Sequence, residues 1–318
     1  MSPPAGPERV ATLALDRGPA RAAARARWRR TRVLLGAGGA RLGAAILLAT
    51  AACAAVPGLL APLDPNEQRL LARFTPPASR TADGTLAVLG TDQLGRDILS
   101  RVIHGARTSV LIGLSAVLLA GALGTGLGLA AGIRGGPWDH AVMRLADLQF
   151  AFPFILLAIT VIGVLGPSIR NIVLVVGLSN WCAYARVVRA ETLALRERAF
   201  VDAARALGAP LGRVVWRHVL PNVSASLIVV ATFGVAGAIL TEAGLSFLGL
   251  GVPLEIPSWG GMLAEGRQFV DTRYWLALFP GAALFVTVMG INLLGDALRD
   301  ALDPHLQTGQ TRASVDRL

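Results

Sequence analysis

The chain has 318 residues, of which 53% are hydrophobic and only 16% are charged. Soluble globular domains contain about 25% charged residues, so this composition excludes an ordinary soluble protein and predicts a membrane protein. The basic residues are all arginine, and the formal net charge is +10. Because these arginines lie beside apolar segments, they favour a role in membrane orientation over nucleic-acid binding. The two cysteines, Cys53 and Cys182, lie in apolar segments and are expected to be packing residues, not a disulfide or a metal site.

The N-terminal region, residues 1–41, is a basic arm rich in alanine and proline. Arginines that directly precede an apolar span predict that the N-terminus stays in the cytoplasm. Residues 42–63 carry no charge and are long enough to cross a hydrocarbon core, which needs about 20 residues. A signal peptide is the alternative, but its apolar region is typically about 7–15 residues long. We therefore expect an uncleaved first transmembrane helix.

Residues 64–107 are expected to be extracytoplasmic, because their acidic side chains roughly balance their arginines. This segment ends in the sequence LGTDQLGRD, which is dense in turn residues and precedes a short amphipathic helix. The simplest interpretation is a surface turn followed by an interfacial helix. The motif residues are Gly90, Thr91, Asp92, Gly95, Arg96 and Asp97.

Three further spans follow, over residues 109–133, 148–169 and 171–185, with a short loop at 134–147. The glycines of the second span predict close packing between helix backbones. Phe152 and Pro153 lie near the start of the third span, where proline favours a kink or an unwound turn. Two interpretations are open for this step: a place in the transport pathway, or a kink alone.

Residues 186–222 are expected to form a cytoplasmic loop, because arginines outnumber acids there. Two short helices are predicted in its second half. The apolar stripe of the first is Phe200, Ala203, Ala204 and Leu207, and that of the second is Leu211, Val214, Val215 and Val219. Gly208 would adopt positive φ after the first helix, Pro210 would begin the second helix, and Pro221 would end it.

The fifth span covers residues 223–241 and is followed directly by Glu242. An acid at this position is either a pathway or gate residue, or a group exposed at the outer interface. Ser246, a further pathway or gate candidate, lies in the next segment, which glycine and proline interrupt and which is expected to be a re-entrant or surface piece. The sixth span covers residues 274–294. Six crossings place both termini in the cytoplasm, with a permease core at 108–298 and a tail at 299–318.

Two motifs resemble those of bacterial ABC-importer permeases. The order Asp202-Ala203-Ala204, Gly208, Leu220-Pro221 is similar to the cytoplasmic EAA loop, although Asp202 replaces the usual glutamate and His218 replaces a branched aliphatic residue. The segment from Gly90 to Asp97, together with Leu245–Gly251, is similar to the branch that transports dipeptides, oligopeptides, nickel or glutathione. The resemblance extends over about residues 28–305 and is to the C-type subunit.

This resemblance implies an all-α membrane protein with the type I ABC importer fold in the bacterial inner membrane. It implies four kinds of partner: a homologous permease subunit, two ATPase subunits, an extracytoplasmic binding protein and membrane lipid. It also implies that the EAA loop couples to the ATPase. The expected coupling residues are Phe200, Asp202, Ala203, Ala204, Arg205, Gly208, Leu220 and Pro221. Peptides are the favoured cargo, with nickel and glutathione as alternatives.

No catalytic constellation is evident in the sequence. A Walker A loop requires a lysine that contacts the β- and γ-phosphates, and this chain has no lysine. We therefore expect no cofactor in this chain, with ATP and magnesium bound by partner subunits. A secondary carrier is disfavoured because acids are scarce within the spans. A purely structural membrane protein is the other alternative.

Overall fold

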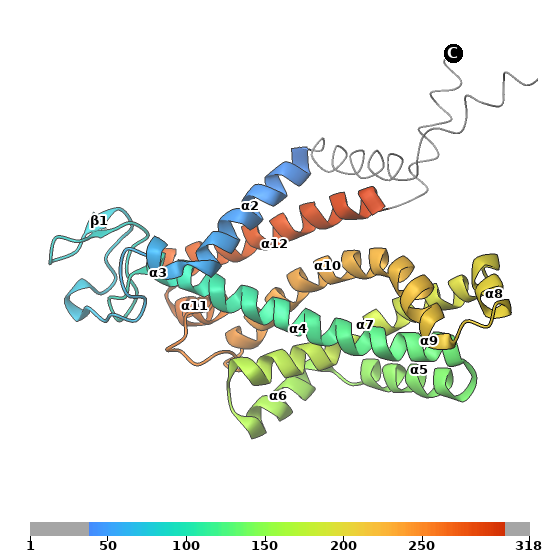
Figure 1. The fold of residues 1–318 in the computed structure, drawn as a ribbon. Coiled ribbons are helices and arrows are strands. Elements are labelled where there is room, and N and C mark those ends of the chain that lie inside the picture. Colours follow the sequence, from blue (N-terminus) through green and yellow to red (C-terminus); the bar gives the residue numbers. More distant parts are fainter. Residues whose placement is uncertain (1–37, 303–318) are drawn as a thin grey trace, which may run out of the picture.

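The computed structural model describes residues 38–302, so the expectations for the basic arm up to residue 37 and for the tail from residue 303 lie outside the described part. The chain is built from long helices, with one small sheet at one end of the bundle (Figure 1). The elements in chain order are α2 (Gly38–Ala55), α3 (Pro57–Leu60), η2 (Leu70–Ala72), β1 (Ser79–Arg80), β2 (Leu86–Ala87), α4 (Ile98–Arg134), α5 (Gly136–Ala151), α6 (Phe154–Leu165), α7 (Ile169–Arg196), α8 (Ala199–Ala206), α9 (Leu211–Val214), the π-helical turn η3 (Val215–Val219), α10 (Leu220–Phe247), α11 (Trp259–Gly266), η4 (Arg267–Phe269) and α12 (Trp275–Leu302).

Five of the described helical segments are long and apolar enough to cross a membrane: α2, α4, α7, the continuous stretch Leu211–Phe247, and α12. The pair α5 and α6 is a sixth candidate, although its two helices meet at an angle of 86°. The predicted number of six spans is therefore confirmed if this bent pair counts as one.

Several predicted boundaries were wrong. The expected loop at 134–147 is mostly helix α5, and the expected third span is broken at Phe152 and Pro153. Helix α7 continues to Arg196, well into the expected loop. The first span ends earlier than expected, because α2 stops at Ala55 and Pro57 begins a separate short helix. Helices α2 and α5 end next to Pro57 and Pro153, which interrupt the backbone, whereas α7 ends at Arg196 without a glycine or proline nearby.

The β end of the molecule, residues 61–97, is mostly irregular and carries the small sheet (Figure 1). Strands β1 and β2 are antiparallel and pair Ser79 with Ala87 and Arg80 with Leu86. The Thr81 hydroxyl donates a hydrogen bond to the Asp83 carboxylate in the connecting turn. This bond is the largest of the contacts that lower the pKa of Asp83 to about 2. The opposite end of the molecule carries α8 and α9.

The close pair α4 and α7 forms the centre of the bundle (Figure 1). Three glycines of α4 lie so close to α7 that a Cβ atom would clash with it: Gly124 against Trp181 and Tyr184, Gly128 against Ala185, and Gly132 against Thr192. Their spacing of four residues keeps them on one face of the helix. The predicted role of glycine in helix packing is thus confirmed, since the backbones can approach closely without side chains between them.

We predict that Gly124→Ala destabilises the protein, because the new Cβ would lie 2.5 Å from the carbonyl oxygen of Trp181. Overpacking of this kind typically costs about 1–3 kcal/mol. Gly126→Ala is the matched control, since a Cβ there meets no atom within 4 Å. Thermal unfolding of the detergent-purified protein would measure both changes. Equal melting temperatures for the two variants would contradict the packing argument.

Candidate functional site

Helices α8 and α9 form a bent pair, which we call the α8–α9 hairpin (residues 199–214). Gly208 follows α8 with φ of +77°, and the amide of Ala209 donates to the carbonyl of Ala204. This bond closes the helix end in the Schellman arrangement, for which glycine is the preferred residue. Pro210 caps the start of α9. The predicted positive φ at Gly208 and the predicted helix start at Pro210 are therefore confirmed.

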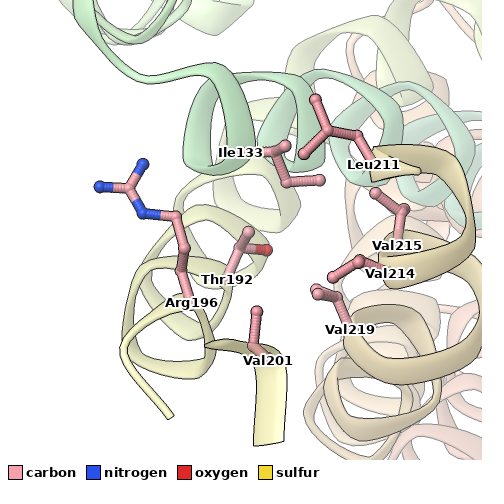
Figure 2. A pocket seen from close by; sticks show the side chains of 8 residues that line it. All are labelled: Ile133, Thr192, Arg196, Val201, Leu211, Val214, Val215 and Val219. Carbon is pink, nitrogen blue, oxygen red and sulfur yellow. The ribbon is translucent and has the colours of Figure 1, made fainter. Parts of the chain in front are cut away.

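The inner side of the hairpin is held by a cluster of valines. Val201 of α8 and Val214 of α9 pack with three valines from α7, η3 and α10: Val188, Val219 and Val223. Figure 2 shows several of these side chains around a cavity of about 10 Å³, which has room for one water molecule at most. The hairpin is thus anchored to both α7 and α10 by dry apolar contact.

The predicted stripe of the first helix was wrong in its orientation. The buried residue is Val201, whereas Phe200 is 44% exposed and Leu207 is 89% exposed. Ala204 packs partly against the valine cluster, and Ala203 faces outward. The second stripe was correct for Val214 and Val219, but Leu211 is exposed. The spacing of apolar residues within so short a helix could not reveal which of its sides would pack against the bundle.

The outward face of the hairpin combines apolar, acidic and small side chains. Phe200 and Leu207 are exposed beside Asp202 and Ala203, whereas Leu211, although partly exposed, lines the cavity on the inner side. The Phe200 ring lies near the His218 ring, with centroids 6.1 Å apart. Arg205 belongs to α8, and its side chain lies outside the described part. This face therefore presents a protruding apolar surface, a kind that commonly marks an interaction site.

Pro221 does not end a helix, contrary to the prediction. It occupies the first turn of α10, and the helix runs from Leu211 to Phe247 through η3. Because proline has no N–H, the usual i to i−4 bond cannot form at Pro221. The π-helical turn lies directly before it, where the amide of Leu220 donates to the carbonyl of Val215, five residues back. The Asn222 side-chain amide donates to the carbonyl of His218. The chain thus enters the span through a continuous helix with an extra residue in one turn.

At the β end, the second motif forms a buried ionic cluster and not the surface turn that was expected. Arg96 and Arg101 both contact Asp92 and Glu265, with nitrogen–oxygen distances of 2.6 to 2.7 Å. The exposed fraction of each of the four side chains is 12% or less. Glu265 belongs to α11, so the cluster joins the motif and α4 to a helix more than 160 residues away. The sequence analysis did not identify Arg101 and Glu265 as members of this cluster. The signal that could have found them is a charged residue beside an apolar segment, because such a charge usually needs a partner.

The remaining motif residues shape the backbone around this cluster. Gly90 and Gly95 have φ of +84° and +75°, and a Cβ at Gly95 would overlap the carbonyl group of Arg69. Asp97 caps α4 by accepting from the amide of Ser100 at 2.8 Å. Thr91 is buried and pairs with Asp97 in an isolated bridge. The motif is therefore a compact structural unit at the start of α4.

Glu242 and Ser246 are buried between α10, α4 and α11, so exposure of Glu242 at an interface was wrong. The carboxylate accepts a hydrogen bond from Ser246 at 2.8 Å and a longer one from Ser109 at 3.4 Å. The backbone amide of Trp259, at the start of α11, donates to the Ser109 hydroxyl. Helix α10 continues past Glu242 to Phe247. Glu242 and Ser109 thus link α10, α4 and α11 where these three helices meet.

Phe152 and Pro153 form the break between α5 and α6. The Gln149 side chain, one turn earlier, accepts from the Trp181 indole and donates to the carbonyl of Leu178, which fixes α5 to α7. Phe152 is 60% exposed, whereas Glu242 and Ser246 are buried. The four pathway candidates therefore do not share one open surface. Within residues 38–302, no group of three or more His, Cys, Asp or Glu side chains is placed to hold a metal ion.

Residues 124–308 match the family described as binding-protein-dependent transport system inner membrane component. The chain belongs to this family. The matched region contains the α8–α9 hairpin, the bent pair from α5 onward and the buried Glu242. With its several apolar spans, the chain is therefore a multi-pass protein of the bacterial inner membrane, as the sequence predicted.

Several relatives are similar over most of the chain. A dipeptide transport system permease protein DppC from Alkalihalophilus pseudofirmus is 45% identical over 69% of this chain and 72% of its own length. A di/tripeptide transport system permease protein DppC from Pseudomonas aeruginosa is 43% identical over 85% of this chain and 89% of its own length. A glutathione transport system permease protein GsiD from Escherichia coli is 46% identical over 69% of this chain and 72% of its own length.

Among solved structures, an inward-facing MetNI methionine ABC transporter has a similar fold. The match has a TM-score of 0.51 at 18% identity and covers 64% of this chain and 96% of that chain. The predicted type I importer permease fold is thereby confirmed.

We predict that Glu265→Gln destabilises the β end, because Arg96 and Arg101 would then share the single carboxylate of Asp92. Breaking a buried ion pair from one side typically costs about 3–5 kcal/mol. Asp147→Asn is the control, since Asp147 pairs with Arg186 at an exposed site where a pair contributes about 0–1 kcal/mol. Thermal unfolding in detergent would compare the two. A loss for Glu265→Gln no larger than that of the control would refute the importance of the cluster.

Proposed function

We propose that this chain is one of two permease subunits of an ATP-driven importer of di- or oligopeptides. The carrying observation is the 43% identity, over 85% of the chain, to a relative named for di- and tripeptide transport. Glutathione is the second candidate, because a relative named for glutathione transport is 46% identical. A nickel importer is less favoured, since no relative considered above is named for metal transport.

In this proposal the chain forms half of the membrane pathway and hydrolyses no ATP itself. A homologous permease forms the other half, two ATPase subunits bind ATP and magnesium, and an extracytoplasmic binding protein delivers the peptide. The absence of lysine from the sequence supports a separate ATPase, because a Walker A loop needs one. The basic loop side of the membrane would then be the cytoplasmic side.

The α8–α9 hairpin is the proposed contact with the ATPase. Its exposed Phe200 and Leu207 offer an apolar surface, and the small Ala203 beside Asp202 lets another backbone approach. On its inner side, Val201 and Val214 attach the hairpin to α7 and α10. Movement of the hairpin would therefore be transmitted to two spans through a dry, closely packed contact. Leu220 and Pro221 would set the direction in which α10 enters the membrane.

Uptake by proteoliposomes tests the proposal directly. The complex of both permeases and both ATPases, supplied with the binding protein and ATP, is expected to accumulate labelled dipeptides. The same vesicles without the ATPases are expected to show no uptake, even with a proton or sodium gradient. Uptake by this chain alone would reject an ATP-driven importer in favour of a secondary carrier.

We predict that Gly208→Asp lowers ATP-driven uptake at least tenfold while the protein still inserts into the membrane. The φ of +77° at Gly208 lies in the left-handed region, which costs other residues about 1–2 kcal/mol, so the bend between α8 and α9 would shift. Gly84→Asp is the matched control: it adds the same charge at a φ of +83°, in the turn between β1 and β2 away from the hairpin, where a Cβ meets nothing within 4 Å. Membrane abundance and uptake would be measured for both. Normal uptake by Gly208→Asp would count against a coupling role.

A further inference from the structure

A cavity lies between the middle parts of α4, α7 and α10, away from the hairpin and from the buried ionic cluster. Its volume is about 210 Å³. It exists because small residues face one another where the three helices converge, namely Ala116 on α4, Ala183 on α7, and Gly234 and Ala238 on α10. The wall is therefore mostly apolar, and part of it is open at Ala183, which is exposed.

The cavity lies at the depth of the hydrocarbon core. On α7 its residues fall between Arg170 and Arg186, and that interval contains no charged residue. On α10 they fall in the uncharged interval between His218 and Glu242. Arginines flanking an uncharged stretch of a span mark its two ends, so the cavity lies within the membrane-spanning part of α7.

Two polar groups line this otherwise apolar cavity. The Asn180 side chain is exposed, and its amide donates to the carbonyl of Val176 at 2.8 Å, which leaves its oxygen and a second N–H available. Tyr184 is only 3% exposed, and its hydroxyl has no hydrogen-bond partner in the described part of the chain. The hydroxyl lies directly against Gly234, where a Cβ atom would clash with it.

These groups argue against lipid as the occupant. A polar side chain in the middle of a span almost always faces the protein interior or a water-filled passage, because hydrocarbon cannot satisfy its hydrogen bonds. An exposed asparagine beside an apolar cavity instead suits a ligand that has both an apolar part and hydrogen-bonding groups. A peptide has both, in its side chains and its backbone amides.

We propose that the cavity receives one apolar side chain of the transported peptide, while Asn180 hydrogen-bonds to the peptide backbone. The proposal rests on the peptide-importer function proposed above and assigns Ala183 and Asn180 as specificity-determining and positioning residues within it. At about 210 Å³ the cavity is smaller than the roughly 300–1,000 Å³ of a pocket that holds a whole small ligand. It would therefore select for side-chain size and not enclose the entire peptide.

The test compares a substitution that fills the cavity with one that does not. Ala183→Leu places a larger side chain at the mouth of the cavity. Ala122→Leu is the matched control, because Ala122 is exposed on α4 and does not line the cavity. Each variant would be assembled with its partner subunits and one binding protein in proteoliposomes, and uptake of Ala-Ala and Leu-Leu dipeptides would be measured at saturating binding protein.

For Ala183→Leu we expect the ratio of Leu-Leu to Ala-Ala uptake to fall about tenfold. In an apolar pocket, space for one methylene group more or less changes the preference between two substrates by about tenfold or more. The control is expected to keep the wild-type ratio. Asn180→Ala is expected to lower uptake of both dipeptides by the same factor without changing their ratio, while membrane abundance stays normal. Because Asn180 is exposed, the protein is expected to fold without it.

The outcomes separate this inference from the function on which it rests. If the wild-type complex imports neither dipeptide, the proposed function fails. If it imports both and Ala183→Leu leaves their ratio unchanged, the cavity assignment fails while the importer function stands. If Ala183→Leu reduces both dipeptides equally, the cavity is filled by lipid or by the other permease, and the proposal is also overturned.

Discussion

The close contact between α4 and α7 supports the rest of the structure. Lipid provides no hydrophobic force that would drive helices together, so membrane helices associate through van der Waals contact and hydrogen bonds. Gly124, Gly128 and Gly132 allow this contact over two turns of α4, where any Cβ would clash with α7. Because α4 has 37 residues and is therefore about 55 Å long, it extends beyond a hydrocarbon core of about 30 Å. It thereby joins the two ends of the molecule.

The two ends use different kinds of contact. At the β end, polar groups buried in the protein attach α11 to α4: Glu265 through Arg96 and Arg101, and Trp259 through Ser109. At the other end, valines around a nearly filled space attach the α8–α9 hairpin to α7 and α10. The β end is therefore held by buried polar contacts, and the hairpin end by close apolar packing.

Local signals in the sequence were sufficient for a large part of the fold. Gly208 and Pro210 marked the hairpin because positive φ and a missing N–H each restrict where a residue can stand. Uncharged stretches marked the spans because the hydrocarbon core excludes charge over a fixed thickness. The motif around Asp202 and the motif around Asp92 indicated the family, which the comparison then confirmed.

Only the tertiary structure decided which groups meet. Val201 is buried and Phe200 is exposed, although both belong to one apolar helix, because the choice depends on where α7 and α10 lie. Arg101 and Glu265 are 164 positions apart, and no local pattern relates them. The sequence by itself determined the number of apolar spans and the bend at Gly208 and Pro210, since these depend on neighbouring residues, but not the ends of α2, α5 and α7. The buried faces, the ionic cluster and the central cavity depend on which helices come together, and that is a property of the whole packed chain.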